Sequence, residues 1–192
     1  MDARVRYTKR TIRESFLQLL QKKPLQKITV CEICKAAEIN RATFYKYYAN
    51  PYDLLQKLEL ELLDGLEEKL KKIQLGEPEE IFRTVLNDIQ QQAESYCTIF
   101  SGNGDTSFRQ RVFSICYSGN MEHLRQLFPA AGEHQLDWLY HFTAEGCNGI
   151  LSRWIAGGMQ EPVDDVVMFL TRVILAINTG IVMTENSVSV TD

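Results

Sequence analysis

Three helix-start signals in close succession constrain the N-terminal part of this chain more than any other feature. Thr29 and Glu32 form a capping box, Asn40 is a second N-cap residue, and Asn50 precedes Pro51, which suits the first position of a helix. Because each signal starts a new helix, the first two of these helices can only be short. Two short helices joined by a turn, with a longer helix on each side, are typical of a helix-turn-helix.

The remainder of the chain also has helical periodicity, with apolar residues three or four positions apart and no alternating strand pattern. The motif helices are expected to start after Thr29 and to run from Asn40 through Tyr48. The other predicted helices cover 8–22, 51–73, 78–97, 106–127 with a break near Gly119, 133–157 and 163–185. The sequence therefore predicts an all-α protein, in which a three-helix N-terminal domain is joined through a long fourth helix to a C-terminal helical bundle.

The charge is divided unevenly along the chain. The formal net charge of −4, taken alone, argues against a nucleic-acid partner. Residues 1–57, however, carry twelve Lys and Arg against five Asp and Glu, whereas residues 58–192 carry nine against twenty. This asymmetry predicts a basic module that meets a polyanion and an acidic body that does not.

Composition disfavours secretion and membrane spanning. The N-terminus lacks the apolar core of a signal peptide, and Arg172 and Asn178 interrupt the longest apolar run, 166–182. Five Cys is an odd number without framework spacing, which fits reduced thiols. We therefore predict a cytoplasmic protein without a membrane segment.

Two spacings are compatible with metal sites, but simpler interpretations are favoured. Cys31 and Cys34 lack a second pair, so packing is favoured and a thiol sensor is the alternative. His141 and Glu145 lie four positions apart and could share a metal, but a polar helix flank is favoured. No nucleophile–base pair or phosphate loop occurs at a meaningful spacing, so we predict no enzyme, no cofactor and no metal.

The helix that starts at Asn40 is expected to turn Phe44 and Tyr48 inward and its opposite face toward a major groove. The N-termini of both motif helices present backbone N–H groups to phosphates. The predicted DNA-binding residues are Thr29, Asn40, Arg41, Ala42, Thr43, Tyr45, Lys46 and Tyr47. The alternative is an amphipathic helix with an ordinary solvated face.

These residues carry a resemblance to a known family. Residues 28–37 and 39–48 resemble the TetR family of transcriptional regulators, and the resemblance covers about residues 8–65. It implies a homodimer that binds operator DNA through paired helix-turn-helix heads. Residues 50–55 and 146–154 resemble a subgroup whose C-terminal region is like that of dihydroxyacetone-kinase regulators.

The resemblance also implies how the chain is divided. It assigns DNA binding to residues 1–57, with the motif at about 30–49, and effector binding and dimerisation to 58–192. In many members a small effector lowers the affinity for DNA. Two positions depart from the family, which usually has Gly where Glu38 stands and Lys where Pro51 stands. Glu38 would store about 1 kcal/mol of strain if its φ were positive, and Pro51 would remove one phosphate contact.

The C-terminal body supplies two further sets of candidates. The residues predicted to line a pocket for an unidentified small-molecule effector are Tyr96, Phe100, Phe113, Tyr117, Trp138 and Phe142. The residues predicted at a four-helix dimer interface are Gly146, Gly149, Ile150, Phe169, Val173 and Ile177. The alternative for the last two helices is that they pack only within their own subunit.

The sequence therefore predicts a DNA-binding transcriptional regulator, which we expect to be a homodimeric repressor released by the effector. The alternative function is a coactivator or regulator of the same fold that a partner protein controls.

Overall fold

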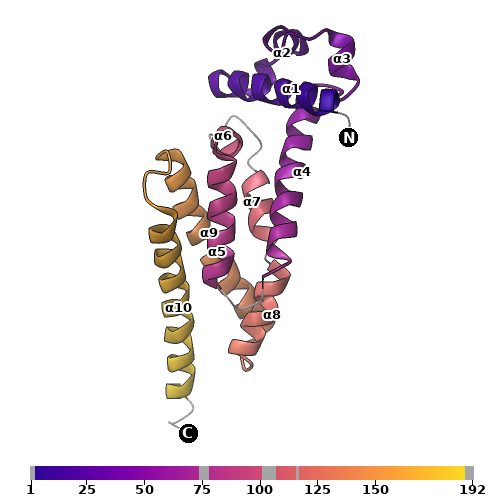
Figure 1. Cartoon of the computed structure of the whole chain (residues 1–192). Coiled ribbons are helices and arrows are strands. Elements are labelled where there is room, and N and C mark those ends of the chain that lie inside the picture. Colours follow the sequence, from indigo (N-terminus) through magenta and orange to yellow (C-terminus); the bar gives the residue numbers. More distant parts are fainter. Residues whose placement is uncertain (1–2, 74–77, 101–106, 116, 189–192) are drawn as a thin grey trace. The chain divides into compact units, whose positions relative to one another are not determined.

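A computed structural model describes residues 3–73, 78–100, 107–115 and 117–188, and their regular structure is helical throughout (Figure 1). The predicted all-α class is therefore confirmed. The chain forms two compact units: unit 1 comprises Met1–Gly65 and Gln92–Phe108, and unit 2 comprises Leu66–Gln91 and Arg109–Asp192. The predicted boundary between residues 57 and 58 falls inside a continuous helix, and the division of functions there stays a prediction.

Unit 1 contains the three N-terminal helices and the start of the fourth. Its elements are α1 (Ala3–Lys22), the 3-10 helix η1 (Leu25–Lys27), α2 (Val30–Ala36), α3 (Arg41–Tyr45), the first part of α4 (Pro51–Leu70) and α6 (Ala93–Thr98). Side chains from α1 to α4 form its core, and those with no exposed surface are Ile12, Phe16, Leu20, Ile33, Phe44 and Leu54.

The three predicted N-caps are formed. The Thr29 hydroxyl accepts a hydrogen bond from the backbone N–H of Glu32 (3.3 Å), and the Glu32 carboxylate accepts one from the backbone N–H of Thr29 (3.0 Å). The Asn40 side chain accepts the N–H of Thr43 (2.8 Å), and Asn50 caps α4 in the same way. These local bonds satisfy N–H groups that a helix cannot satisfy internally, and they set where α2, α3 and α4 begin.

Two predicted helix bounds in unit 1 were wrong. Helix α1 begins at Ala3 and not at residue 8, and the Thr8 hydroxyl donates to the carbonyl of Arg4 (2.9 Å), as a threonine inside a helix does. Helix α3 ends at Tyr45, because the chain then tightens into a turn in which the Tyr47 N–H donates to the carbonyl of Phe44 (2.9 Å).

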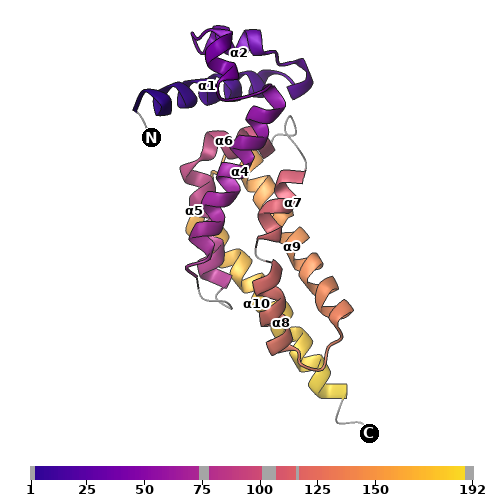
Figure 2. The ribbon, with the colours of Figure 1, turned by 90° about the vertical axis from the view of Figure 1, so that its right-hand side faces the viewer.

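Unit 2 contains the rest of α4, α5 (Pro78–Gln91), α8 (Tyr117–Leu127), α9 (Glu133–Ala156) and α10 (Val163–Val188). The first two residues of α7 (Ser107–Ser114) belong to unit 1 and the rest of α7 to unit 2. Helix α5 packs along α10, and α8 packs against α9 (Figures 1 and 2). One cluster of its core joins α8 to α9 and comprises Met121, Leu124, Phe128, Leu136 and Tyr140. Among the described residues, no helix has both the length and the apolar character needed to cross a membrane.

Two predicted helices of the body are each divided. The predicted helix 78–97 is interrupted at Gln92, whose backbone (φ −118°) is not helical and whose carbonyl starts α6 by accepting the N–H of Tyr96. The predicted helix 106–127 is interrupted after Ser114, whereas Gly119 lies inside α8. A glycine costs only about 1 kcal/mol in a helix, which neighbouring packing readily offsets.

Ion pairs tie α5 to its neighbours in unit 2. The Lys69 ammonium of α4 pairs with the Asp88 carboxylate of α5, and Arg83 of α5 pairs with Asp164 of α10. The Asp88 side chain has no exposed surface, whereas Lys69 is partly exposed. The Asp88 carboxylate is therefore a buried charge in unit 2, and removing the paired Lys69 cation is expected to lower the stability of the fold.

Candidate nucleic-acid interface

Helix α3 presents one face to the core and one to solvent. Phe44 and Tyr48 are 0% and 3% exposed, and their ring centroids lie 5.7 Å apart, which confirms that they pack inward. The opposite face of α3 therefore carries Arg41, Ala42 and Tyr45, all exposed. This is the geometry that a major groove requires, with an anchored helix and small or polar groups pointing outward.

The eight predicted DNA-binding residues all lie on α3 or next to it, apart from the cap of α2. Six are exposed: Thr29, Asn40, Arg41, Ala42, Tyr45 and Lys46. The remaining two, Thr43 and Tyr47, are half-buried. Helices α2 and α3 pack on each other, so the Thr29 cap and the α3 residues belong to one compact unit. This placement is compatible with DNA binding, and the role of these residues in it remains a prediction.

Cations gather at the end of α3. The ammonium groups of Lys9 and Lys46 lie 5.7 and 5.8 Å from the centroid of the Tyr47 ring. Lys57 donates to the Tyr47 carbonyl (3.0 Å) and pairs with Asp53 (2.9 Å). The exposed Lys46 can therefore face a phosphate, while Lys57 holds the turn after α3. The sequence did not single out Lys9, because only the packing of α1 in three dimensions brings it beside Tyr47.

Charged groups on and next to α2 form hydrogen bonds that shift their pKa values. Hydrogen bonds from the Lys23 ammonium and from Thr29 lower the pKa of Glu32 to about 2. A hydrogen bond with Cys31 raises the pKa of Arg41. Cys34 is buried and Cys31 is exposed, so packing accounts for Cys34 only. The described part of the chain contains no group of three or more His, Cys, Asp or Glu side chains that could hold a metal ion.

The turn between α2 and α3 contains Glu38, where the sequence predicts backbone strain if φ is positive. Glu38 has a φ of 52°, in the left-handed region that favours glycine. The Ile39 N–H donates to the carbonyl of Cys34 (3.0 Å), and the Glu38 N–H donates to that of Lys35 (3.4 Å). This pair of bonds is the Schellman ending of a helix, in which the residue at the position of Glu38 is usually glycine.

The aromatic residues predicted to line an effector pocket fall into two groups. Tyr96 is fully buried and packs against Phe100 and Phe108, with ring centroids about 6 Å apart, in unit 1. The other group lies in unit 2, where Trp138 and Phe142 are 69% and 70% exposed. In the described part of the protomer those two side chains therefore lie at the surface, and their role in effector binding stays a prediction.

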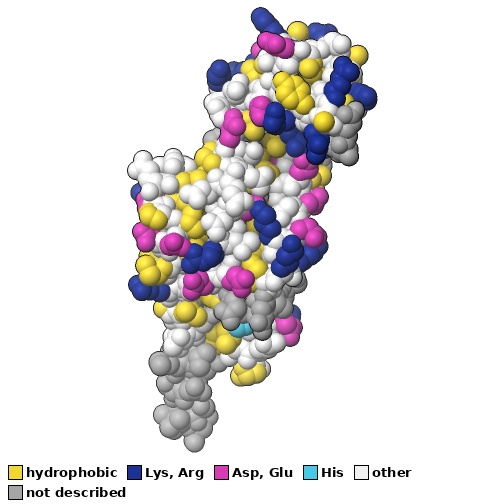
Figure 3. All heavy atoms as spheres, in the orientation of Figure 1, with side chains coloured by type: hydrophobic (Ala, Val, Ile, Leu, Met, Phe, Trp, Pro, Cys, Tyr) yellow, Lys and Arg dark blue, Asp and Glu magenta, His cyan; other side chains and the backbone are white. Residues whose placement is uncertain are grey.

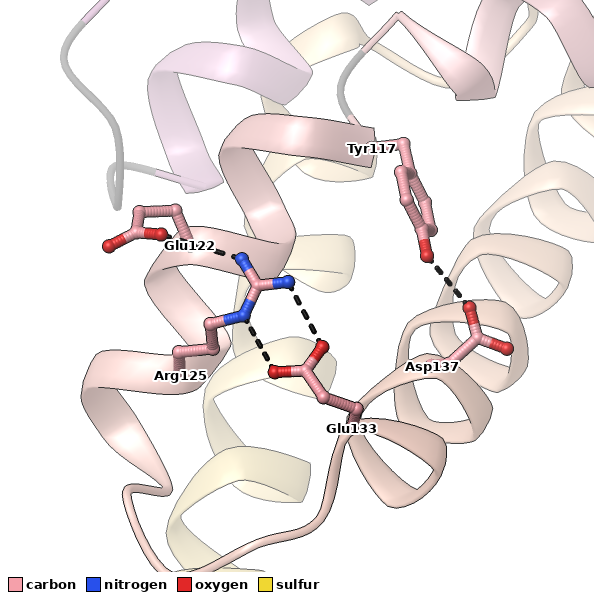
Figure 4. A network of polar contacts seen from close by, with 5 residues as sticks. All are labelled: Tyr117, Glu122, Arg125, Glu133 and Asp137. Carbon is pink, nitrogen blue, oxygen red and sulfur yellow. Dashed lines mark hydrogen bonds and ion pairs between the residues drawn. The ribbon is translucent and has the colours of Figure 1, made fainter.

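The two remaining members of the predicted pocket lie on α7 and α8. The Tyr117 hydroxyl donates to the Asp137 carboxylate (2.8 Å), which raises the pKa of Tyr117, and Arg125 forms a two-point contact with Glu133 (Figure 4). Tyr117 therefore helps to join α8 to α9. The side chain of Phe113 lies outside the described part of the structure.

The predicted dimer residues are not buried within the protomer. Gly146 and Gly149 are exposed on α9, and Phe169 on α10 is 54% exposed. Ile150, Val173 and Ile177 are half-buried. All six remain available to a second chain.

Comparisons with known proteins agree with this geometry. Residues 76–176 match a family model of the TetR type described as the transcriptional regulator C-terminal region. A segment of 59 residues is 39% identical to the uncharacterised HTH-type transcriptional regulator YxbF of Bacillus subtilis (strain 168). That segment is 30% of this chain and 16% of YxbF, so the chain matches only a small part of that relative's length.

Solved structures share the fold over nearly the whole chain. The TetR transcriptional regulator from Streptococcus agalactiae 2603V has a TM-score of 0.65 and 24% identity, over 89% of this chain and 95% of that one. The dihydroxyacetone kinase operon activator DhaS has a TM-score of 0.59 and 18% identity, over 90% and 96%. At these identities the likeness concerns the fold, and the resemblance to the dihydroxyacetone-kinase subgroup stays a prediction.

The capped α2–α3 pair on an all-α body defines a helix-turn-helix protein. The family model covers more than half of the sequence. The chain belongs to the TetR family of transcriptional regulators.

Proposed function

We propose that this chain is a homodimeric transcriptional repressor that binds operator DNA through α3 of each subunit and is released by a small-molecule effector. The observation that carries the proposal is the anchoring of α3, in which buried Phe44 and Tyr48 aim Arg41, Ala42 and Tyr45 outward. Arg41 can contact a guanine edge or a phosphate, and Ala42 allows close approach to the bases. Lys46 and Tyr47 are suited to phosphates, which fix register.

A gel-shift titration on DNA from upstream of the chain's own gene tests DNA binding. We expect specific binding at low salt, and we expect Arg41→Ala to weaken it without changing helicity or oligomeric state. Lys72→Ala is the matched control, because Lys72 is an exposed cation of unit 2. Absence of specific binding by the wild-type chain would refute the proposal. Binding that requires an added protein partner would instead support the coactivator alternative.

The proposed dimer uses the exposed faces of α9 and α10. Phe169 and Leu175 of α10 are more than half exposed, as are Trp138 and Phe142 of α9. A Cβ built at Gly149 would meet no atom within 4 Å, so the protomer itself does not require glycine there. Large exposed apolar side chains on neighbouring helices are typical of an interface between subunits.

Gly149→Leu tests this interface, because the protomer has open space at Gly149 while a close-packed partner helix would not. We expect Gly149→Leu to convert dimers to monomers in light scattering and to leave helicity unchanged, since leucine favours a helix more than glycine does. Gly65→Leu is the matched control, because Gly65 also lies within a helix with no atom within 4 Å of its Cβ position. A dimer that persists in Gly149→Leu would place the interface elsewhere.

The proposed effector acts through α6, which packs on α1 within unit 1. The Gln21 amide of α1 donates to the Thr98 hydroxyl of α6 (3.2 Å), and Tyr96 and Phe100 lie nearby in sequence. A ligand that displaces these aromatic rings would move α6. Through the Gln21–Thr98 contact it would also move α1, which packs against α2 of the helix-turn-helix. Thermal-shift screening for small molecules, followed by DNA titration with each hit, tests this step. Hits that stabilise the protein but leave DNA affinity unchanged would contradict it.

A further inference from the structure

Helix α1 carries a row of cations to which the helix-turn-helix assigns no role. Its first turn, which precedes the predicted start at residue 8, adds Arg6 to Lys9 and Arg10, and we name these three residues the α1 stripe. At 3.6 residues per turn, the three side chains fall within about 100° of each other around the helix. They lie on the same side of the helix as Leu17 and Leu20, which are buried further along α1.

The α1 stripe lies beside the end of α3. The Lys9 ammonium is 5.7 Å from the centroid of the Tyr47 ring, and Tyr47 follows α3 two residues after its end. Arg6 is one helical turn before Lys9, and Arg10 is the next residue in the chain, all within unit 1. Figure 3 shows Lys and Arg side chains along the right-hand edge of unit 1, the side on which Figure 1 places α3 and the start of α1.

Arg6 and Arg10 are available to a ligand, in contrast to Arg13. Arg6 is exposed, and the Arg10 side chain is 67% exposed. Arg10 has an ion-pair partner in Glu14 (3.7 Å), but a pair at this distance between exposed side chains is weak and can yield to a phosphate. Arg13, one turn further on, is half-buried and pairs with Glu61 of α4. Arg13 therefore anchors α1, whereas Arg6 and Arg10 face outward and Lys9 lies half-buried beside Tyr47.

We propose that Arg6 and Arg10, supported by Lys9, bind backbone phosphates of the double-stranded DNA beside the segment that α3 contacts. Arg6 and Arg10 are separated by about 6 Å along the helix, so each can take its own phosphate. Phosphates carry no sequence information, so the stripe adds affinity and fixes orientation without reading bases. This inference rests on the proposed DNA-binding function.

The double variant Arg6→Gln/Arg10→Gln tests the stripe. Fluorescence anisotropy follows binding to a duplex from upstream of the chain's own gene and to a random-sequence duplex of equal length. Because each neutralised phosphate contributes about 0.9 to the slope of log affinity against log salt, we expect the slope to fall by about 1.8 on both duplexes. Between about 50 and 200 mM salt, the wild-type chain should then lose about 12-fold more affinity than the variant.

Two controls isolate the effect. Lys22→Gln/Lys72→Gln removes the same charge from exposed positions outside the stripe, and Arg6→Lys/Arg10→Lys keeps the charge, so both should retain the wild-type slope. Gln and Arg have similar helix propensities, and circular dichroism should show that the Arg6→Gln/Arg10→Gln variant keeps its helicity.

The outcomes separate this inference from the proposed function. If Arg6→Gln/Arg10→Gln keeps the wild-type salt slope, or if Lys22→Gln/Lys72→Gln lowers that slope equally, the phosphate-binding role of the α1 stripe is refuted. The proposed DNA-binding function would not be affected by either result. A wild-type chain that binds neither duplex overturns the proposed function itself.

Discussion

Replacing Glu38 with glycine is expected to stabilise the chain. Helices α2 and α9 both end in a left-handed residue at the same position of the motif, but α9 has Gly158 there (φ 80°), whereas α2 has Glu38 (φ 52°). Glycine adopts this conformation without the clash between Cβ and the following carbonyl. The Glu38 side chain is exposed, so removing it sacrifices no buried packing.

The size of the effect follows from two opposing contributions. A residue other than glycine in the left-handed region costs roughly 1–2 kcal/mol in the folded state. Glycine is more flexible in the unfolded chain, and this entropy reduces the gain in the free energy of unfolding by about 0.4–1 kcal/mol. We therefore expect the free energy of unfolding of Glu38→Gly to rise by about 1 kcal/mol. For a chain of this size, that corresponds to a melting temperature about 2–4 °C higher.

Thermal unfolding followed by circular dichroism measures this change, at one fixed protein concentration because association would also shift the transition. Glu38→Ala is the matched control, since it removes the carboxylate but keeps the Cβ and therefore the strain. We expect no increase for Glu38→Ala. If both variants gained equally, the carboxylate and not the backbone would be responsible, and a gain in neither would refute the assignment of strain to Glu38.

Two further predictions concern charged groups. Because Lys23 and Thr29 lower the pKa of Glu32 from 4.5 to about 2, its stabilising contribution is present above pH 4.5 and is lost as the pH falls toward 2. The stability difference between wild type and Glu32→Gln, from melting curves across this pH range, should shrink accordingly, and a difference independent of pH would contradict it. Lys69→Met should destabilise the chain by about 2 kcal/mol in urea titrations, because it removes a cation that pairs with the buried Asp88 carboxylate, whereas Lys69→Arg should be nearly neutral.

The sequence predicted the helix-turn-helix closely because its determinants are local. The caps at Thr29, Asn40 and Asn50 act within three residues, so they set the starts of α2, α3 and α4 without help from the rest of the fold. The predicted start of α1 at residue 8 was wrong, since Thr8 lies inside a longer helix and its hydroxyl donates back to the Arg4 carbonyl. The contact of Lys9 with Tyr47 could not be predicted, because it joins two helices that are separated along the chain.

Periodicity alone could not separate a pocket from an interface on α9. This helix carries two apolar stripes, both spaced for a helix face. The buried stripe includes Leu136, Tyr140, Cys147, Leu151 and Trp154, and the exposed stripe includes Trp138, Phe142, Gly146 and Gly149. At about 100° per residue the two stripes lie on roughly opposite sides of the helix.

The packing of α8 covers the first part of the buried stripe of α9. The core cluster that joins the two helices takes Leu136 and Tyr140, and the Tyr117–Asp137 hydrogen bond supports the same orientation. Trp138 and Phe142 are thereby turned away from α8. A stripe of two large aromatic rings continued by two glycines suits another helix better than a small molecule, because the glycines leave room for a close backbone. We therefore assign Trp138 and Phe142, first predicted to line the effector pocket, to the proposed subunit interface, where Trp138→Ala should weaken dimerisation and leave effector binding intact.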